Sequence, residues 1–167
     1  MNSVSLGSLA DNPQKKTLFI VRGLPGSGKT TFVKNFLKGV LHIENDMFHM
    51  KGLNYEWSAN GQTQAIEFCS NFVKYAMEHG IVCAVSNTFT RKRFVDYYVD
   101  MAKRYGYTVF VFRCMGEFTN IHSVPYETLK NMSDGFEDYE GEIFVRPCDN
   151  NYMFSYTPFT VDTKTEM

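Results

Sequence analysis

The stretch from Thr17 to Thr30 reads TLFIVRGLPGSGKT and decides the fold class of this 167-residue chain. Residues 17–21 form a short apolar run, which is typical of a strand buried on both faces of a parallel sheet. Residues 23–30 match the pattern G-x-x-x-x-G-K-[ST], and residues 31–37 carry apolar side chains at helical spacing. A strand, a glycine-rich turn and a helix in this order predict a phosphate-binding loop, or P-loop.

The residue types of this loop suit a triphosphate. Gly23, Gly26 and Gly28 permit backbone angles that let successive N–H groups converge on one anion. The helix that opens at about Lys29 adds the positive end of its dipole. We expect the Lys29 ammonium to bridge the β- and γ-phosphates, and the Thr30 hydroxyl to be a ligand of Mg²⁺. The predicted cofactors are therefore ATP, or another nucleoside triphosphate, and Mg²⁺. The predicted nucleotide-binding residues are Gly23, Leu24, Pro25, Gly26, Ser27, Gly28, Lys29, Thr30 and Thr31.

Strand-like and helix-like segments alternate along the rest of the chain. This alternation predicts an α/β fold with a central parallel sheet of four to five strands flanked by helices. Further strands are expected at residues 40–43, 81–85, 108–112 and 143–145. Helices are expected at residues 31–37, 62–79, 91–105 and 125–132. We divide the chain into a flexible lead-in (1–16), a P-loop domain (17–147) and an unassigned tail (148–167).

The composition narrows the class of protein. Hydrophobic residues make up 44 %, enough for one packed core, and the formal net charge is −1. That charge argues against a chain that coats nucleic acid non-specifically, although a local basic patch remains compatible with it. No apolar run approaches the ~18 residues of a membrane span, so we expect a soluble, intracellular protein without a membrane partner. The cysteines form no zinc-type pair, and we interpret them as small buried hydrophobes of a protein in a reducing compartment. They are Cys69, Cys83, Cys114 and Cys148.

Polar side chains follow the second predicted strand. Glu44, Asn45 and Asp46 come directly after its apolar residues. Because the carboxyl ends of parallel strands line the ligand crevice, we expect Asp46 on the same edge as the P-loop. There it would accept the proton of an attacking hydroxyl, or hold the metal through water. The alternative interpretation is a solvent-facing loop acid or a helix N-cap.

The third predicted strand ends in the same way, with Ser86, Asn87 and Thr88, which would orient an acceptor hydroxyl or its phosphate. Residues 91–93, Arg-Lys-Arg, then open the next helix. Cations are unfavourable at a helix N-terminus because the dipole repels them. An anion at this point, such as a substrate backbone phosphate, would explain the arrangement. A solvated basic turn is the alternative.

With these residues in view, the chain resembles the P-loop 5′-hydroxyl polynucleotide kinases, of the phage type and their metazoan relatives, from about Thr17 to Tyr139. Residues 23–31 are similar to their Walker A segment, and residues 43–48 to their strand-end motif, in which an Asp starts a D-D-[FY] triplet. Residues 85–89 resemble their D-N-T-N segment. Residues 120–125 resemble their lid motif R-N-x-H-x-V-P.

The resemblance implies a P-loop NTPase fold of the kinase type with a short helical lid. It also implies transfer of the γ-phosphate of ATP to the 5′-hydroxyl of RNA or DNA, so that the implied partner is a single-stranded nucleic acid 5′ end. Asp46 would be the general base, and Lys29 would hold the phosphates. Thr30 and Asp46 would bind the metal. The acceptor would be bound by His49, Asn87, Thr88, Arg91 and Arg93, and the lid would contribute Asn120 and His122.

The chain departs from the family pattern at positions that bear on activity. Met47 replaces the second Asp of the triplet, and His49 stands where the phage enzymes place an acceptor-binding Arg. Ser86 and Phe89 replace the first and last residues of D-N-T-N. Thr119 occupies the position at which the family has the lid arginine. An arginine on the transferring phosphoryl group is worth roughly 10³-fold or more in rate.

Three interpretations follow from the departures. In the first, the chain is a polynucleotide kinase in which Arg91, Arg93 or His122 takes the place of the missing lid arginine. In the second, it is a small-molecule kinase, acting on a nucleoside or sugar with the same scaffold. In the third, it is an interaction module that binds nucleoside triphosphate and has lost catalysis.

Overall fold

The computed structural model describes residues 15–51, 54–55, 58–118, 124–149 and 151–156. Its strands are β1 (Thr17–Arg22), β2 (Leu41–Glu44), β3 (Met50–Lys51), β4 (Asn54–Tyr55), β5 (Cys83–Asn87), β6 (Thr108–Cys114), β7 (Ile143–Cys148) and β8 (Asn151–Tyr156). Its helices are α2 (Lys29–Phe36), α3 (Asp46–His49), α4 (Ala59–Glu78), α5 (Lys92–Arg104) and α6 (Tyr126–Asp134).

The main sheet has six strands in the order β2-β5-β1-β6-β7-β8. The first five are parallel, and β8 pairs with β7 in the antiparallel sense. Strand β1 therefore lies in the centre, between β5 and β6. This arrangement confirms the predicted α/β fold with a parallel sheet, and each strand expected from the sequence is present. The P-loop strand is central because its neighbours on both sides are fed by helical crossovers.

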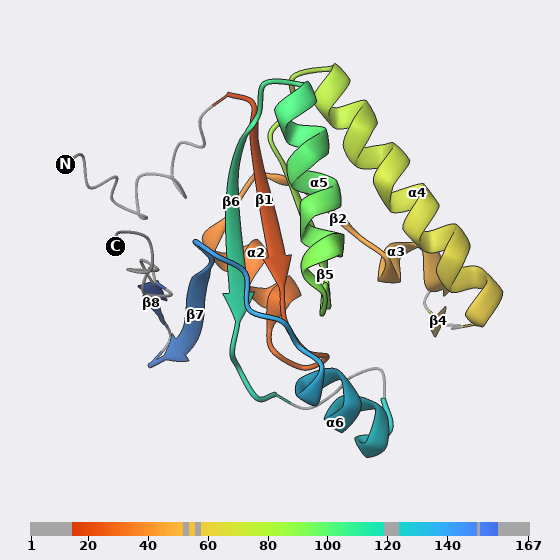
Figure 1. Cartoon of the computed structure of the whole chain (residues 1–167), viewed down its shortest axis with the longest axis vertical. Helices are drawn as coiled ribbons and strands as arrows, with labels where there is room; N and C mark the ends of the chain where they lie inside the picture. Colours follow the sequence, from red (N-terminus) through yellow and green to blue (C-terminus); the bar gives the residue numbers. More distant parts are fainter. Residues whose placement is uncertain (1–14, 52–53, 56–57, 119–123, 150, 157–167) are drawn as a thin grey trace, which may run out of the picture.

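Alternate residues of β1 face two separate cores. Leu18 and Ile20 pack with α4 and α5, whereas Phe19 and Val21 pack with α2 on the opposite face. All four side chains are fully buried, as a continuous apolar run with helices on both faces requires. Figure 1 shows α4 and α5 on one side of β1 and α2 behind it. The P-loop strand is thus held rigidly from both sides.

Strand β8 lies in the segment for which the sequence carried no prediction. Its side chains close the core over α2: the Tyr152 ring meets the Phe32 ring edge-on at 5.1 Å, and the Phe154 ring lies 5.1 Å from the Phe36 ring. The sheet therefore continues past residue 147 and covers an aromatic face of α2 that would otherwise meet solvent. Residues 1–14 and 157–167, most of the expected lead-in and tail, lie outside the described residues.

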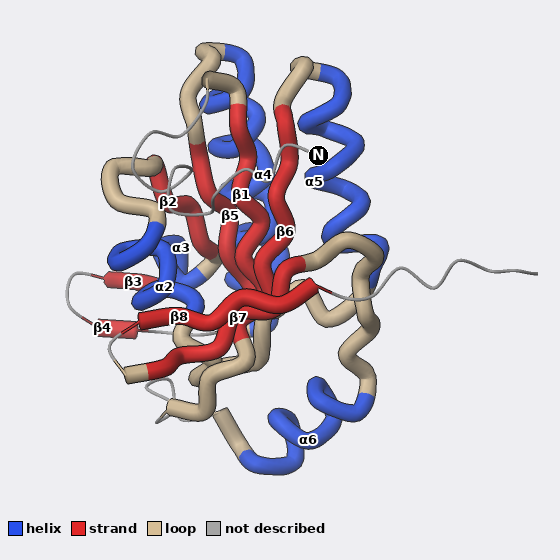
Figure 2. Tube along the Cα trace, turned by 90° about the vertical axis from the view of Figure 1, so that its left-hand side faces the viewer, coloured by secondary structure: helices blue, strands red, loops and turns tan. Residues whose placement is uncertain are grey.

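The short helix α6 lies beyond the carboxyl ends of β1 and β6, away from the helices that cover the sheet (Figures 1 and 2). It corresponds to the short helix expected at residues 125–132 and has no buried residue. Among the helices that the structure describes, none is both long enough and apolar enough to cross a bilayer.

Candidate functional site

The P-loop connects β1 to α2 with a backbone that only glycine accommodates at its first position. Gly23 has φ +156°, and a Cβ there would collide with the Ser27 side chain and lie 2.7 Å from the Cys114 carbonyl oxygen. The Gly23 N–H donates to the carbonyl oxygen of Thr88, which joins the loop to the end of β5. The loop is therefore packed on its inner side and attached to the neighbouring strand end.

The outer side of the loop is covered by residues that follow β6. The Phe118 N–H donates to the Gly26 carbonyl at 2.8 Å, and the Gly116 N–H donates to the Ser27 carbonyl at 3.2 Å. The Phe118 ring then lies over Gly28, where an added Cβ would be 2.9 Å from a ring carbon. Gly28 has φ +90° and is the N-cap of α2. A side chain at Gly28 would displace this ring.

Lys29 lies at the start of α2 and folds back over the loop. Its Nζ donates to the carbonyl oxygens of Gly23 at 3.0 Å and Leu24 at 2.9 Å. Burial lowers the pKa of Lys29, and the negative charges of Asp46 and Glu44 oppose that shift. The ammonium is therefore held at the mouth of the loop within electrostatic reach of both carboxylates at the end of β2.

The Thr30 side chain is hydrogen-bonded to Glu44, a residue to which the sequence pattern assigned no separate role. Its Oγ1 donates to Glu44 Oε2 at 3.0 Å, and the Ser86 hydroxyl donates to the same oxygen at 3.3 Å. Ser86 also contacts His42 Nε2 at 2.5 Å, and burial lowers the pKa of His42. The signal available in the sequence was the position of Glu44, two residues before Asp46 at a strand end that faces the crevice.

Asp46 begins α3 directly after β2 and is partly exposed. The structure therefore brings Lys29, Thr30 and Asp46 to one edge of the sheet, as the sequence predicted. His49 ends α3. The lid positions Asn120 and His122, together with Thr119, lie outside the described residues.

The end of β5 lies beside the P-loop. Asn87 Oδ1 accepts from the Thr88 N–H at 2.8 Å, which shapes the turn that Thr88 shares with Gly23. Phe89, which replaces a polar residue of the family pattern, has φ +42° and is buried against the Tyr98 ring. Phe89 is thus a core contact, and Asn87 and Thr88 are the polar groups left at this strand end.

The start of α5 contains an anion from the chain itself. Glu137 Oε2 accepts from the Lys92 N–H at 2.7 Å, and Glu137 Oε1 lies 3.4 Å from Arg91 Nη1. The hydrogen bond from the Lys92 N–H is the main reason why the pKa of Glu137 is lowered. The sequence suggested a substrate phosphate at this helix start, whereas the structure has an internal carboxylate. Arg93 lies over the Phe94 ring, 4.9 Å from its centroid.

A buried arginine ties these loops together. Arg22, the last residue of β1, is fully buried, and its Nη1 lies 2.7 Å from Glu142 Oε2. Its other nitrogens donate to the carbonyl oxygens of Phe89, at 3.1 and 2.7 Å, and of Glu137, at 2.8 Å. The Phe136 ring lies 4.4 Å from its guanidinium. One side chain therefore joins the base of the P-loop, the end of β5 and the segment that follows α6.

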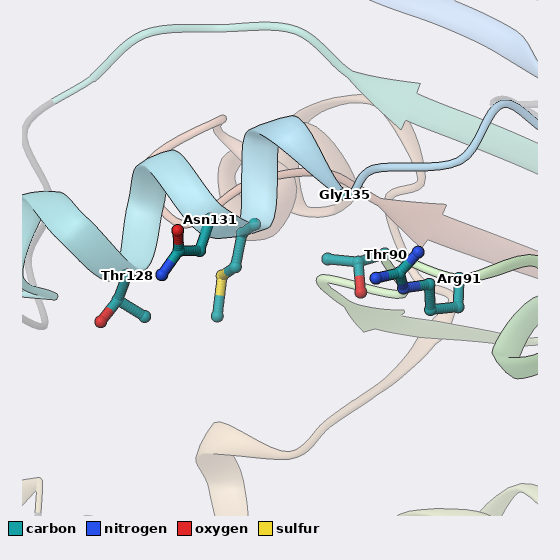
Figure 3. A pocket seen from close by; sticks show the side chains of 6 residues that line it. Thr90, Arg91, Thr128, Asn131 and Gly135 are labelled. Carbon is teal, nitrogen blue, oxygen red and sulfur yellow. The ribbon is translucent and has the colours of Figure 1, made fainter.

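A cavity of about 270 Å³ lies between α6 and the loop that joins β5 to α5. Figure 3 shows side chains from both elements directed to the same space. The lining mixes polar and apolar surface, with two hydroxyls, one amide, one guanidinium and one thioether. Its residues are Thr90, Arg91, Thr128, Asn131, Met132 and Gly135.

The oxygen donors at this edge fit Mg²⁺. Among the described residues, no group of three or more His, Cys, Asp or Glu side chains forms a metal cage. Mg²⁺ rarely uses such a cage, because it binds one or two carboxylates together with substrate phosphates and water. Thr30, Glu44 and Asp46 supply that type of donor. Ser27 Oγ and Asn45 Nδ2 are buried and lack a hydrogen-bond partner among the described residues.

Comparison with solved structures agrees with this fold. The chain superposes on a gluconokinase from Sinorhizobium meliloti 1021 with a TM-score of 0.54, 15% identity, and 80% of this chain and 83% of that chain covered. It superposes on a chain of the Pnkp1/Rnl/Hen1 RNA repair complex with a TM-score of 0.52, 19% identity, and 75% of this chain but only 39% of that chain covered. Identities this low show a shared P-loop kinase-like fold alone.

Sequence comparison shows the family. The chain is 30% identical over 152 residues to the uncharacterized protein PM0531 of Pasteurella multocida (strain Pm70), covering 79% of this chain and 84% of that protein. Residues 18–117, which run from β1 through the P-loop to the segment that covers it, match the family model AAA_33, described as an AAA domain. The chain therefore belongs to the AAA_33 family of P-loop proteins.

Proposed function

We propose that this chain transfers the γ-phosphate of ATP to the 5′-hydroxyl of a polynucleotide, RNA or DNA, presented as a single-stranded end. One observation carries the proposal: Lys29, Thr30 and Asp46 lie together at the carboxyl edge of the sheet. A strand end with Asn87 and Thr88 lies beside them, and a cavity with polar groups on both walls lies next to that strand end.

The nucleotide would bind along the P-loop. The loop N–H groups and the start of α2 would hold the phosphates, with Lys29 as the clamp. Thr30 would hold Mg²⁺, which when bound neutralises charge on the β- and γ-phosphate oxygens. Gly23 and Gly28 would keep the loop in this conformation, because a Cβ at either position would disturb the packing of the loop.

Asp46 would act as the general base. It accepts the proton of the acceptor hydroxyl while the acceptor oxygen forms a bond to the γ-phosphorus. The bond between that phosphorus and the β–γ bridging oxygen breaks, and ADP leaves. Most of the catalytic effect in such a transfer comes from positioning and charge, which the packed loop and the joined strand ends favour.

The acceptor would approach from the side of α6. Thr90 and Arg91 on one wall of the cavity, and Thr128 and Asn131 on the other, offer hydroxyl, guanidinium and amide groups for a sugar-phosphate. The order of motifs along the chain supports a polynucleotide acceptor. Arg91 would have to leave Glu137 to bind a phosphate, which the long 3.4 Å contact with exposed partners would permit.

A second candidate is a small-molecule kinase. The cavity of about 270 Å³ is of a size for a sugar or nucleoside, and the anion at the start of α5 is internal. The gluconokinase named above shares the fold. On this alternative, the same Lys29, Thr30 and Asp46 act on a different acceptor.

An acceptor panel tests the proposal. The purified chain is incubated with Mg²⁺ and γ-labelled ATP, and with a 5′-hydroxyl oligonucleotide, a nucleoside or a hexose acid in separate reactions. We expect label on the oligonucleotide only, lost in Lys29→Ala and in Asp46→Asn. Label on the nucleoside or sugar would favour the second candidate. ATP binding by calorimetry with no transfer to any acceptor would indicate an interaction module.

A further inference from the structure

Glu44 is in direct contact with the P-loop threonine. The Glu44 side chain is 21 % exposed, and its Oε2 accepts hydrogen bonds from Thr30 Oγ1 at 3.0 Å and from Ser86 Oγ at 3.3 Å. Three elements therefore meet on one carboxylate oxygen: the start of α2, the end of β2 and the end of β5.

We infer that Glu44 is the carboxylate that orients the Thr30 hydroxyl for Mg²⁺ and would help to hold the metal at this strand end, while Asp46 would serve as the base. The inference rests on the proposed function and deepens it, because it divides the two acids at the end of β2 between two tasks. Glu44 would be a positioning residue that acts on the metal through Thr30 and through the water shell that Mg²⁺ retains.

The chemistry of a hydroxyl explains why this contact matters. Thr30 Oγ1 has one proton to donate and lone pairs to offer. If Glu44 accepts the proton, a lone pair is turned away from the carboxylate and is available to a metal. A carboxylate is a stronger acceptor than a neutral group, and it also balances the positive charge of a cation nearby. The hydroxyl is therefore pre-oriented before the metal arrives.

The position of Glu44 also explains why Ser86 is tolerated. Glu44 and Ser86 are paired directly across the β2–β5 ladder, so their side chains project to the same place from adjacent strands. Ser86 stands where the resembling family has an acid, at the end of β5. The acidic group is thus present in this site, but β2 carries it and Ser86 supports it with a hydrogen bond.

Calorimetry with a non-hydrolysable ATP analogue tests the inference without requiring transfer. Affinity is measured in Mg²⁺ and in EDTA for the wild type and for Glu44→Gln, which retains an oxygen for Thr30 but loses the charge. We expect the gain in affinity from Mg²⁺ to fall by about 10- to 100-fold, the usual effect of losing an outer-shell group. In EDTA we expect equal or tighter binding, because a negative charge beside the phosphates is gone.

Two further variants act as matched controls. Ser86→Ala removes one of the two hydrogen bonds to Glu44 Oε2 and keeps the carboxylate, so the gain from Mg²⁺ should fall by less than it does in Glu44→Gln. The exchange Glu44→Ser with Ser86→Asp moves the carboxylate across the ladder, so the gain from Mg²⁺ should be clearly larger than in Glu44→Gln. Melting curves identify any variant that is not folded, and Glu44→Asp then replaces Glu44→Gln, with partial retention of the gain expected.

The effect of Glu44→Gln on affinity in Mg²⁺ and in EDTA separates this role from a merely structural one. For the proposed role, binding weakens in Mg²⁺ and does not weaken in EDTA. Weaker binding in both Mg²⁺ and EDTA would mean that Glu44 only shapes the loop, and it would overturn the inference. A full gain from Mg²⁺ in Glu44→Gln would overturn it as well. If the wild type binds no nucleotide, the proposed function fails. If it binds with a gain from Mg²⁺ that Glu44 does not influence, only this inference fails.

Discussion

The buried ion pair of Arg22 and Glu142 gives the most direct test of how the loops around the site are held. Both side chains are 0 % exposed, and their contact is 2.7 Å. Glu142→Gln keeps the shape of the side chain and removes its charge. Arg22 is then left as a buried cation whose remaining partners are neutral: the amide oxygen introduced at position 142 and the carbonyl oxygens of Phe89 and Glu137. Arg113, which lies 3.2 Å from the other oxygen of Glu142, loses the same negative charge.

Removing one partner of a buried pair costs about 3–5 kcal/mol, because the other charge remains buried without compensation. Burial already lowers the pKa of Arg22, with the bond to Glu142 opposing the shift, so the penalty has a visible source. Since two carbonyl oxygens still solvate the guanidinium, we expect about 3 kcal/mol, the lower end of the range. For a chain of this length, that loss lowers Tm by roughly 6–12 °C.

Urea unfolding followed by circular dichroism measures the loss, with thermal melts as a second assay. Asp138→Asn is the matched control, because Asp138 pairs with Arg113 at 2.6 Å but is 75 % exposed. An exposed pair contributes at most about 1 kcal/mol. If the free energy of unfolding of Glu142→Gln lies within about 1 kcal/mol of that of Asp138→Asn, the buried pair does not hold these loops as we describe.

Three other predictions concern the P-loop, the thiols and the start of α5. Gly28→Ala should weaken binding of an ATP analogue in calorimetry, since its strained φ of +90° alone costs roughly 1–3 kcal/mol, and Phe118→Ala should relieve only the steric part. In native thiol titration with DTNB, the exposed thiol of Cys148 should react rapidly and the three buried thiols slowly. The buried thiols are those of Cys69, Cys83 and Cys114. Burial raises the pKa of the first buried thiol along the chain to about 11 and that of the other two to about 12. Equal reaction rates for all four thiols would contradict the burial described. The pKa of Glu137 is lowered in the folded protein, so its ionised carboxylate stabilises the fold above the unfolded pKa near 4.5. This stabilisation is lost as the pH falls through the folded pKa. Between pH 6 and pH 3, the Tm should therefore fall more for the wild type than for Glu137→Gln.

Much of the fold could be predicted because local pattern and global fold agree in the core. The apolar run of β1 and the glycines that follow it are typical of a central strand that leads into a phosphate-binding loop. Strand β8 could not be predicted in this way. Tyr152 and Phe154 alternate with exposed residues over a short stretch, and what makes them a strand is the aromatic face of α2, far away in sequence.

The sequence predicted those residues of the candidate site that belong to a defined motif or to a strand end. It missed a residue whose type is as common on an exposed surface as in a site. Lys29 and Thr30 follow from the loop motif, and Asp46 from its place at a strand end. Glu44 has a side chain equally suited to solvent, and only the pairing of β2 with β5 brings it to Thr30. The anion at the start of α5 was expected from the residues there, but its source was not, because Glu137 is 45 positions further along the chain.

The most direct test of the central claim compares two oligonucleotides that differ only at the 5′ end. Transfer from γ-labelled ATP in Mg²⁺ is measured on a single-stranded 5′-hydroxyl oligonucleotide and on its 5′-phosphorylated counterpart, with the wild type and Asp46→Asn. We predict label on the 5′-hydroxyl oligonucleotide with the wild type, removable by a phosphatase, and none on the counterpart or with Asp46→Asn. Equal labelling of both oligonucleotides, or none on either while ATP is bound, would contradict the account.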